Sequence, residues 1–306
     1  MTGEGAASAD GPVVEGLVVV DKPAGWTSHD VVARVRRLAG TRRVGHAGTL
    51  DPMATGVLVL GLGRATRLLG HLTHETKEYL GTIRLGAATT TDDAEGEPLV
   101  AAGPERARVT WSMPAAVTAM RRLTGEIDQV PPSYSAIKVS GRRAYAAARA
   151  GEPLTLESRR VLVSEFALLD ARGNDLDVRV VCSAGTYVRS LARDLGADLG
   201  VGGHLAALRR TRVGPFGVAA ARTLDQLADR LVVLSLADAV AIAFPRRDVD
   251  AEQARGVLHG RPLPAVGERG GRGGGPVGVF GPDGAVLALV KDRGATAWPV
   301  CVFSPT

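Results

Sequence analysis

The sequence predicts an α+β protein with a mixed sheet that carries helices on its faces, followed by a small β-rich domain. Segments with the length and pattern of strands are interspersed with segments whose apolar residues recur at helical spacing. Beyond residue 243 the chain becomes rich in Gly and Pro and keeps only short apolar runs. Its 306 residues leave room for one large domain and a smaller one.

We expect three parts: a disordered tail over residues 1–11, a large domain over 12–235 and a C-terminal domain over 236–306. The tail consists of small and acidic residues, unlike an export signal, and no apolar run reaches membrane-spanning length. Cys182 and Cys301 have neither Cys-x-x-Cys spacing nor a nearby His cluster, so we expect no disulfide framework and no metal site. These observations predict a cytoplasmic protein that does not associate with membranes.

The charge of the chain suits a polyanionic partner without requiring one. Its formal net charge is +5 and its sequence pI is about 9.6. Nearly all of the basic residues are Arg, whose guanidinium group suits phosphate binding and base stacking. Because an Arg-rich composition is also typical of a high-GC genome, composition alone leaves nucleic-acid binding open.

The first expected elements are a strand, a turn and a helix. Residues 17–20 form an apolar run of strand length, and the Pro and Gly of residues 21–28 force a turn after it. Thr27 and Asp30 fit a capping box at the start of a helix that Gly40 ends. The apolar stripe of this helix comprises Val31, Val32, Val35 and Leu38.

The stretch 45–60 fits neither a helix nor a simple strand. Its glycines allow positive φ, and Pro52 fixes its own φ while it excludes Asp51 from the helical region. Asp51 is therefore expected in a rigid turn, directly before a buried strand over 57–60. Reactive groups commonly lie on loops that a rigid scaffold fixes. The alternative is a turn without chemistry, since Asp before Pro often opens one.

Later segments continue the α+β pattern. Alternation predicts a strand over 77–85 with Tyr79 facing inward, where a Tyr is most often a packing residue. Residues 89–96 form a polar loop without assignable chemistry.

The Gly- and Pro-interrupted segment 125–138 indicates a projecting arm, with a plain surface loop as the alternative. Further elements are a helix over 114–123, strands over 161–163 and 176–181, a strand-to-helix switch over 182–196, a helical linker over 223–243, and strands over 277–280, 286–290 and 300–303.

The stretch 45–60 resembles, nearly residue for residue, the Gly-His-x-Gly-x-Leu-Asp-Pro-x-Ala-Thr-Gly-x-Leu signature of the TruB family, whose members make pseudouridine at position 55 of transfer RNA. The resemblance covers roughly residues 16–213 and implies a mainly antiparallel sheet of the pseudouridine synthase type. Other matching segments are the Asp-Lys-Pro-x-Gly-x-Thr-Ser turn at 21–28, the Lys-x-Tyr element at 77–79, the Gly-Thr-Tyr-x-Arg motif at 185–189 and the last core motif at 202–211.

This resemblance implies three catalytic residues. Asp51 is the essential aspartate, a nucleophile that attacks the sugar or the base, or instead removes a sugar proton to give a glycal. Tyr79 stacks on the extruded uracil and moves the proton at its C5. Arg189 pairs with Asp51, and a guanidinium neighbour keeps a buried carboxylate ionised and aimed.

Four further residues are implied in substrate binding. Tyr187 lines the uracil pocket and Leu208 contacts the base. His46 fills the space that the extruded base leaves, although a structural hydrogen-bonding role is an equal alternative. Lys22 is expected first to support the stretch 45–60, which the resemblance makes the catalytic loop, and second to face the substrate.

The resemblance also implies the RNA contacts. An insertion at about 124–152, with the basic residues Arg142, Arg143 and Arg149, grips the T-arm of tRNA. Arg209, Arg210 and Arg212 form a second cluster able to bind phosphate. The C-terminal domain is PUA-like and RNA-binding, with a flexible insertion at 270–275.

We expect tRNA as the partner, no cofactor, no metal, no protein partner and a monomer, although no pattern determines the oligomeric state. Two other functions remain open. One is an RNA-binding module or folding chaperone without catalysis, a role that could also accompany the enzyme. The other is the guide-RNA-dependent branch of uridine isomerases, against which the arm at 125–138 argues because it favours direct RNA docking.

Overall fold

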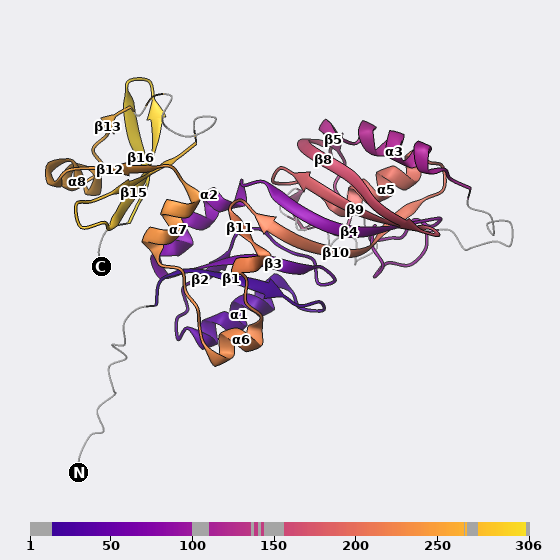
Figure 1. The fold of residues 1–306 in the computed structure, drawn as a ribbon, viewed down its shortest axis with the longest axis horizontal. Helices are drawn as coiled ribbons and strands as arrows, with labels where there is room; N and C mark the ends of the chain where they lie inside the picture. The colour runs from indigo at the N-terminus through magenta and orange to yellow at the C-terminus, as the bar shows by residue number, and fades with distance from the viewer. Residues whose placement is uncertain are drawn as a thin grey trace, which may run out of the picture.

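The computed structural model describes residues 14–99, 110–135, 138–139, 142–143, 156–265, 267 and 275–303. Figure 1 shows a large part built on one long sheet and a smaller sheet beside one end of it. The tail expected over 1–11 lies outside the described residues.

The long sheet is mixed and mainly antiparallel, as predicted. Its order is β1-β3-β10-β4-β9-β8-β5, with β2 paired to β3 and β11 to β10. The parallel pairing between β3 and β10 spans only Arg209↔Thr55 and Arg210↔Gly56. These strands are β1 (Gly16–Lys22), β2 (Val44–His46), β3 (Thr55–Leu62), β4 (Lys77–Leu85), β5 (Gly125–Gln129), β8 (Arg159–Arg172), β9 (Asp175–Cys182), β10 (Gly203–Val213) and β11 (Phe216–Gly217).

Apolar residues of β1 serve two cores, which explains why the strand reads as a continuous apolar run. Val18 and Val20 pack in one cluster with α1, α3, α5 and α6, whereas Leu17 and Val19 pack in a second cluster with η1, α2 and α7. The helices are α1 (Ser28–Leu38), η1 (Gly63–Leu68), α2 (Leu69–Thr73), α3 (Met113–Arg122), α5 (Val188–Asp198), η3 (Val218–Ala220), α6 (Leu224–Asp229) and α7 (Leu236–Ala243).

The predicted start of α1 is confirmed. Thr27 and Asp30 form the capping box, and Val31, Val32 and Val35 are buried. Since Asp30 also satisfies the Thr27 amide, the helix begins at a fixed point next to the turn at 21–28.

The segment 125–138 is not a projecting arm throughout, and that part of the prediction was wrong. Residues 125–129 form β5, the edge strand that pairs with β8. Val130 then packs against α5, where its carbonyl accepts hydrogen bonds from Ser190 and Arg193. The Pro residues at 131 and 132 follow the strand, so they do not interrupt it. The β6 (Lys138–Val139) and β7 (Arg142–Arg143) pair is also described, whereas residues 136–137, 140–141 and 144–152 of the expected insertion lie outside the described residues.

The C-terminal sheet has the order β12-β14-β15-β16-β13 and a core of its own. The three expected strands are present, and a helix that the sequence did not predict, α8 (Ala251–Leu258), packs on the sheet. Phe280, Leu289 and Phe303 join the second core, so this sheet is packed against α7. Its strands are β12 (Arg246–Asp248), β13 (Leu263–Pro264), β14 (Val277–Phe280), β15 (Val286–Arg293) and β16 (Thr296–Val302). Residues 270–274 of the expected flexible insertion are outside the described part.

Within the described residues, no helix is both long and apolar enough to cross a membrane. Cys182 and Cys301 are both free thiols.

Gly56, at the start of β3, is predicted to be sensitive to substitution. Its φ is +98°, and an added Cβ would lie 2.2 Å from the carbonyl oxygen of Arg210. Gly56→Ala should therefore lower the free energy of unfolding by about 3 kcal/mol or more, from conformational strain and overpacking together. Gly173→Ala is the control, because Gly173 has a φ of +60° but no atom near the added Cβ, so only about 1–2 kcal/mol is expected. Equal losses for the two variants in urea unfolding would contradict this account.

Candidate active site

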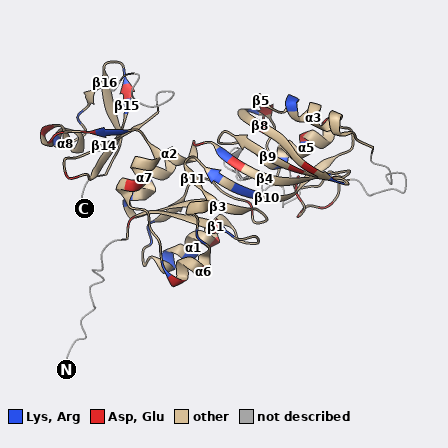
Figure 2. Ribbon diagram, in the orientation of Figure 1, with Lys and Arg blue, Asp and Glu red and all other residues tan. Residues whose placement is uncertain are grey.

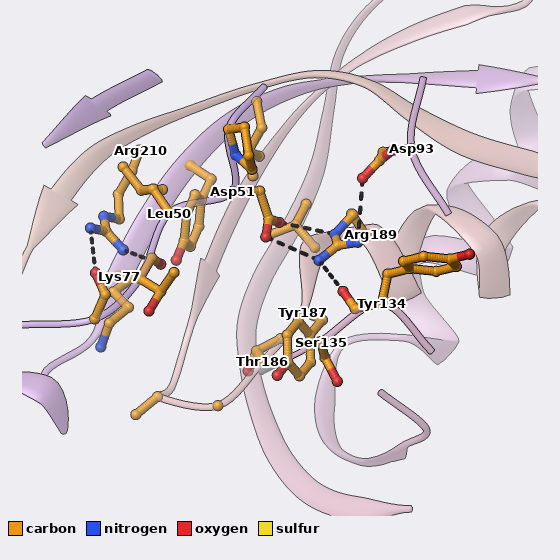
Figure 3. A pocket seen from close by; sticks show the side chains of 18 of the residues that line it. Leu50, Asp51, Lys77, Asp93, Tyr134, Ser135, Thr186, Tyr187, Arg189 and Arg210 are labelled. Carbon is orange, nitrogen blue, oxygen red and sulfur yellow. Dashed lines mark hydrogen bonds and ion pairs between the residues drawn. The ribbon is translucent and has the colours of Figure 1, made fainter. Parts of the chain in front are cut away.

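A cavity of about 630 Å³ lies beside the centre of the long sheet and is built from distant parts of the chain. That volume is within the range of about 300–1,000 Å³ common for small-molecule pockets. Five of the seven predicted catalytic and substrate-binding residues lie on its wall, and Figure 3 shows Asp51, Arg189 and Tyr187 gathered there. These five are Asp51, Tyr79, Tyr187, Arg189 and Leu208.

The carboxylate of Asp51 is held by Arg189 at the start of α5. Nη2 of Arg189 donates a 3.0 Å hydrogen bond to Oδ1 of Asp51, and Nε lies 2.9 Å from Oδ2. The Arg189 side chain is only 5% exposed, whereas that of Asp51 keeps 33% of its surface exposed. The aspartate can therefore meet a ligand in the cavity while its guanidinium partner stays inside the protein.

Arg189 also joins two other segments to the site. Nη1 donates to the carbonyl of Thr91 at 3.0 Å and lies 3.3 Å from Oδ2 of Asp93. Nη2 donates to the carbonyl of Tyr134 at 3.1 Å. One buried side chain thus connects the catalytic loop, the loop at 89–96 and the segment after β5.

Burial and the ion pair act on Asp51 in opposite directions. Burial raises the pKa of Asp51 above its ordinary value, while the Arg189 guanidinium lowers it and the nearby Asp93 raises it. Burial is the largest of these effects, so the net pKa is raised. The Arg189 pairing is consequently what keeps the ionised form accessible in this environment.

The loop at 89–96 contains site residues that the sequence reasoning missed. Asp93 is buried, and besides facing Arg189 it accepts hydrogen bonds from Thr91 and from the amide of Glu95. Asp92 has a φ of +60° and pairs with Arg193 at 2.9 Å. The only available signal was two adjacent acidic residues in a polar loop, which does not reveal partners about a hundred residues away.

The catalytic loop rests on two buried cations. Nζ of Lys22 donates to the carbonyls of Pro23, Trp26 and Pro52, and burial lowers the pKa of Lys22 to about 8. Arg210 is 1% exposed, and its guanidinium donates to the carbonyls of Gly48, Thr49 and Val57. Ser28, at the start of α1, adds two bonds to the backbone of Leu50.

These contacts bear on two expectations. Lys22 is fully buried and does not lie on the cavity wall, which agrees with its expected first role of supporting the loop. Of the three residues expected to form a phosphate-binding cluster, only Arg209 and Arg212 are exposed, at 40% and 38% of their side-chain surfaces. Arg210 is buried under the loop, Arg209 pairs with Asp21 and Arg212 pairs with Glu78. Figure 2 shows the basic stretch of β10 beside the acidic residue of β4.

Two apolar walls complete the site. Tyr79 on β4 lies opposite Arg210 of β10 and is 7% exposed. Burial raises the pKa of the Tyr79 phenol, and the neighbouring Arg210 opposes that rise. Leu208, on the same strand as Arg210, is 8% exposed and faces the cavity. Both side chains offer flat or apolar surface to a base.

Gln129 holds Tyr187 in place at the N-terminus of α5. The Gln129 side chain accepts a 2.8 Å hydrogen bond from the Tyr187 amide and donates a 3.1 Å bond to its carbonyl. Gln129 is fully buried, so the position of Tyr187 is fixed by its backbone before any ligand arrives.

Comparisons with known proteins agree with these motifs. Residues 36–188 match the model of "TruB family pseudouridylate synthase (N terminal domain)", 189–241 that of "tRNA pseudouridylate synthase B C-terminal domain" and 244–304 that of "tRNA Pseudouridine synthase II, C terminal". The tRNA pseudouridine synthase B of Thermobifida fusca is 60% identical over 301 residues, covering 95% of this chain and 99% of that protein. The chain belongs to the TruB family.

Other relatives are consistent with this assignment. The tRNA pseudouridine synthase B of Streptomyces griseus is 56% identical, covering 95% of this chain and 97% of that protein. Among solved structures, a chain of a Cbf5-Nop10-Gar1 complex is 28% identical with a TM-score of 0.73, covering 95% of this chain and 85% of that chain. A chain from an H/ACA RNP bound to a substrate RNA containing 2'-deoxyuridine is 27% identical with a TM-score of 0.70, with the same two coverages.

His46, part of the TruB signature, does not line the cavity. Its Nδ1 is buried without a hydrogen-bond partner, and its ring meets that of His29 edge-on at 5.8 Å. Burial lowers the pKa of His46, and His29 adds to that effect. Neither of the two roles expected for His46 is decided by this arrangement.

In the described residues there is no group of three or more His, Cys, Asp or Glu side chains placed to hold a metal.

The opposing effects on Asp51 lead to a prediction about Arg189→Gln. Because the guanidinium lowers the carboxyl pKa and burial raises it, removal of the guanidinium should raise the pKa of Asp51 further. The measurement is a pH titration of the Asp51 carboxyl carbon by NMR, with the signal assigned from Asp51→Asn. Arg193→Gln is the control, since Arg193 pairs with Asp92 and not with Asp51. A midpoint that stays the same or falls in Arg189→Gln would show that the pair does not set the ionisation of Asp51.

Proposed function

We propose that this protein isomerises uridine 55 in the T-loop of tRNA to pseudouridine. The observation that carries the proposal is the Asp51–Arg189 pair on the wall of a cavity that Tyr79 and Leu208 also line. Relatives that are 60% and 56% identical over nearly their whole length are named tRNA pseudouridine synthase B. We also infer that the protein acts in the cytoplasm as a monomer, without a cofactor.

The reaction requires no redox partner. The N1–C1′ bond of the uridine breaks, the detached uracil turns, and a C5–C1′ bond forms. The proton at C5 is lost and N1 gains one, so atoms and charge balance. Because the target base is stacked inside a folded loop, it must first be extruded, at a cost of a few kcal/mol that pocket contacts offset.

Asp51 is the proposed nucleophile. Its exposed carboxylate faces the cavity, and Arg189 fixes the direction of both oxygen atoms. An ionised carboxylate serves equally for attack on the sugar, for attack on the base, or for removal of a sugar proton. All three routes fail if the carboxylate is neutral.

Tyr79 is proposed as the stacking surface for the extruded uracil. An aromatic ring tolerates the turning of the base, since stacking does not depend on specific hydrogen bonds. Its second proposed role, in moving the C5 proton, is constrained by burial. The raised pKa keeps the phenol neutral, so Tyr79 can accept that proton only while it passes its own proton on.

The two alternative functions are less well supported. A folding chaperone without catalysis needs no carboxylate that a buried Arg189 aims into a cavity. A guide-RNA-dependent isomerase would fit the neighbours from the H/ACA RNP and the Cbf5-Nop10-Gar1 complex, but these are only 27–28% identical, against 60% for the Thermobifida fusca relative. Pseudouridine formation on a purified, unmodified tRNA transcript, with neither guide RNA nor protein partner added, separates all three functions.

Asp51→Asn should keep tRNA binding and abolish isomerisation, because the amide preserves the shape of the side chain but cannot act as a nucleophile or base. Binding of the transcript and pseudouridine formation under single-turnover conditions measure the two effects. Asp170→Asn is the control, since the Asp170 side chain is 62% exposed near the far end of β8. Substantial product from a pure Asp51→Asn preparation would refute the assignment.

Tyr79→Phe should slow turnover more than it weakens binding. Phe keeps the stacking surface but removes the hydroxyl, and loss of a general acid–base group commonly costs about 10²–10⁴-fold in rate. Single-turnover rate and dissociation constant for the same transcript give the comparison. A near-normal rate would remove Tyr79 from proton transfer and leave it as a stacking residue.

A further inference from the structure

Arg159, the first residue of β8, lies on the cavity wall in an unusual setting. Its guanidinium carbon is 4.7 Å from the centroid of the Tyr187 ring, and Nη2 donates to the carbonyl of Gly185. Gly185 has a φ of +86°, and a Cβ there would lie 3.7 Å from the Arg159 guanidinium carbon. The guanidinium is therefore held between an aromatic ring and the backbone of the loop before α5.

Most of the hydrogen-bonding capacity of Arg159 is unused. A guanidinium has five N–H donors, and the Gly185 carbonyl takes one of them. Nε is buried without a partner, and no described carboxylate lies within ion-pair distance of Arg159. The other two arginines of the wall differ, since Arg189 meets two carboxylates and Arg210 donates to three carbonyls.

The next residue shows that a carboxylate partner is available to an arginine on this strand. Arg160 is 67% exposed and pairs with Asp128 and Glu126 of β5. Arg159 points to the opposite side of β8, toward the cavity, where it meets an aromatic ring and no acid. Its charge therefore remains without a carboxylate partner on the wall of the cavity.

A fixed guanidinium with free donors and no acidic neighbour suits a phosphate group, which accepts parallel N–H bonds and neutralises the charge. Positioning of Tyr187 alone would not require that charge, because Gln129 already fixes the Tyr187 backbone. Phosphate contacts set the register of a nucleic acid on its protein without reading its sequence.

We propose that Arg159 binds a backbone phosphate beside the extruded uridine and so sets how deeply the target nucleotide enters the cavity. This role rests on the proposed function, because it takes the RNA of that reaction as the ligand. Tyr187 and Gly185 hold the guanidinium on one side, and because Nε is buried, the Nη groups are the donors left for the phosphate.

The salt dependence of binding tests the phosphate contact. Dissociation constants for an unmodified tRNA transcript are measured across a salt series for the unaltered protein, Arg159→Gln, Arg159→Lys and the neighbouring control Arg160→Gln. Arg159→Gln should weaken binding about tenfold or more, as expected for a hydrogen bond between charged groups. Its slope of log K against log salt should become shallower by about 0.7, the value for one contact to single-stranded RNA. Arg159→Lys should keep the slope, and Arg160→Gln should change neither quantity.

An uncharged linkage then locates the phosphate. T-arm hairpins with a single methylphosphonate, placed in turn on either side of the target uridine, are bound by the unaltered protein and by Arg159→Gln. One placement should weaken binding by the unaltered protein and cause no further loss in the variant. Equal losses in both proteins at each placement, or an unchanged salt slope in Arg159→Gln, overturn the proposal.

These binding results are independent of turnover. If the unaltered protein forms no pseudouridine but the Arg159 results hold, the proposed function fails and the phosphate contact stands. If pseudouridine forms and the salt slope is unchanged, only the role of Arg159 is wrong. Matching urea unfolding midpoints for Arg159→Gln and Arg160→Gln exclude misfolding as the cause of weaker binding.

Discussion

The buried guanidinium of Arg189 is the interaction on which the rest of the site depends. It contacts Asp51 and Asp93 through charge and two carbonyls through hydrogen bonds, and these partners lie on three separate segments. A buried cation lowers the stability of the folded state unless such partners surround it. Loss of any of these partners is therefore expected to destabilise the fold. The same contacts aim Asp51 at the cavity and favour its ionised form. Arg189 therefore contributes both to the stability of the fold and to the reactivity of Asp51.

The catalytic loop is rigid because carbonyl groups, and not only side chains, anchor it. Lys22 and Arg210 donate to backbone oxygens on either side of Asp51, and Ser28 ties Leu50 to α1. The sequence predicted first a supporting role for Lys22 and a phosphate contact for Arg210, and both side chains are buried beneath the loop. A site held this way does not need to reorganise when the substrate arrives, which is a general source of catalytic efficiency.

Local patterns predicted much of the fold because periodicity and caps depend on neighbours in sequence. The capping box of Thr27, the alternation around Tyr79 and the glycine turn before Asp51 all led to the correct elements. Partners far apart in sequence could not be read from pattern. Asp93 looked like a loop residue although it faces Arg189, Arg210 looked like a surface arginine, and β5 looked like part of an arm. The family resemblance supplied the pairing of Asp51 with Arg189 that composition and spacing do not contain.

The central claim is that Asp51, clamped by Arg189, meets an extruded uridine inside this cavity. A crystal structure of the protein with a T-arm hairpin tests it most directly, through the distance from the Asp51 carboxylate to the target nucleotide. The account predicts that the base lies against Tyr79, with C1′ or C6 in contact with the carboxylate and the Arg189 pair intact. A target base that stays stacked in the RNA loop, or a carboxylate turned away from the nucleotide, would contradict it.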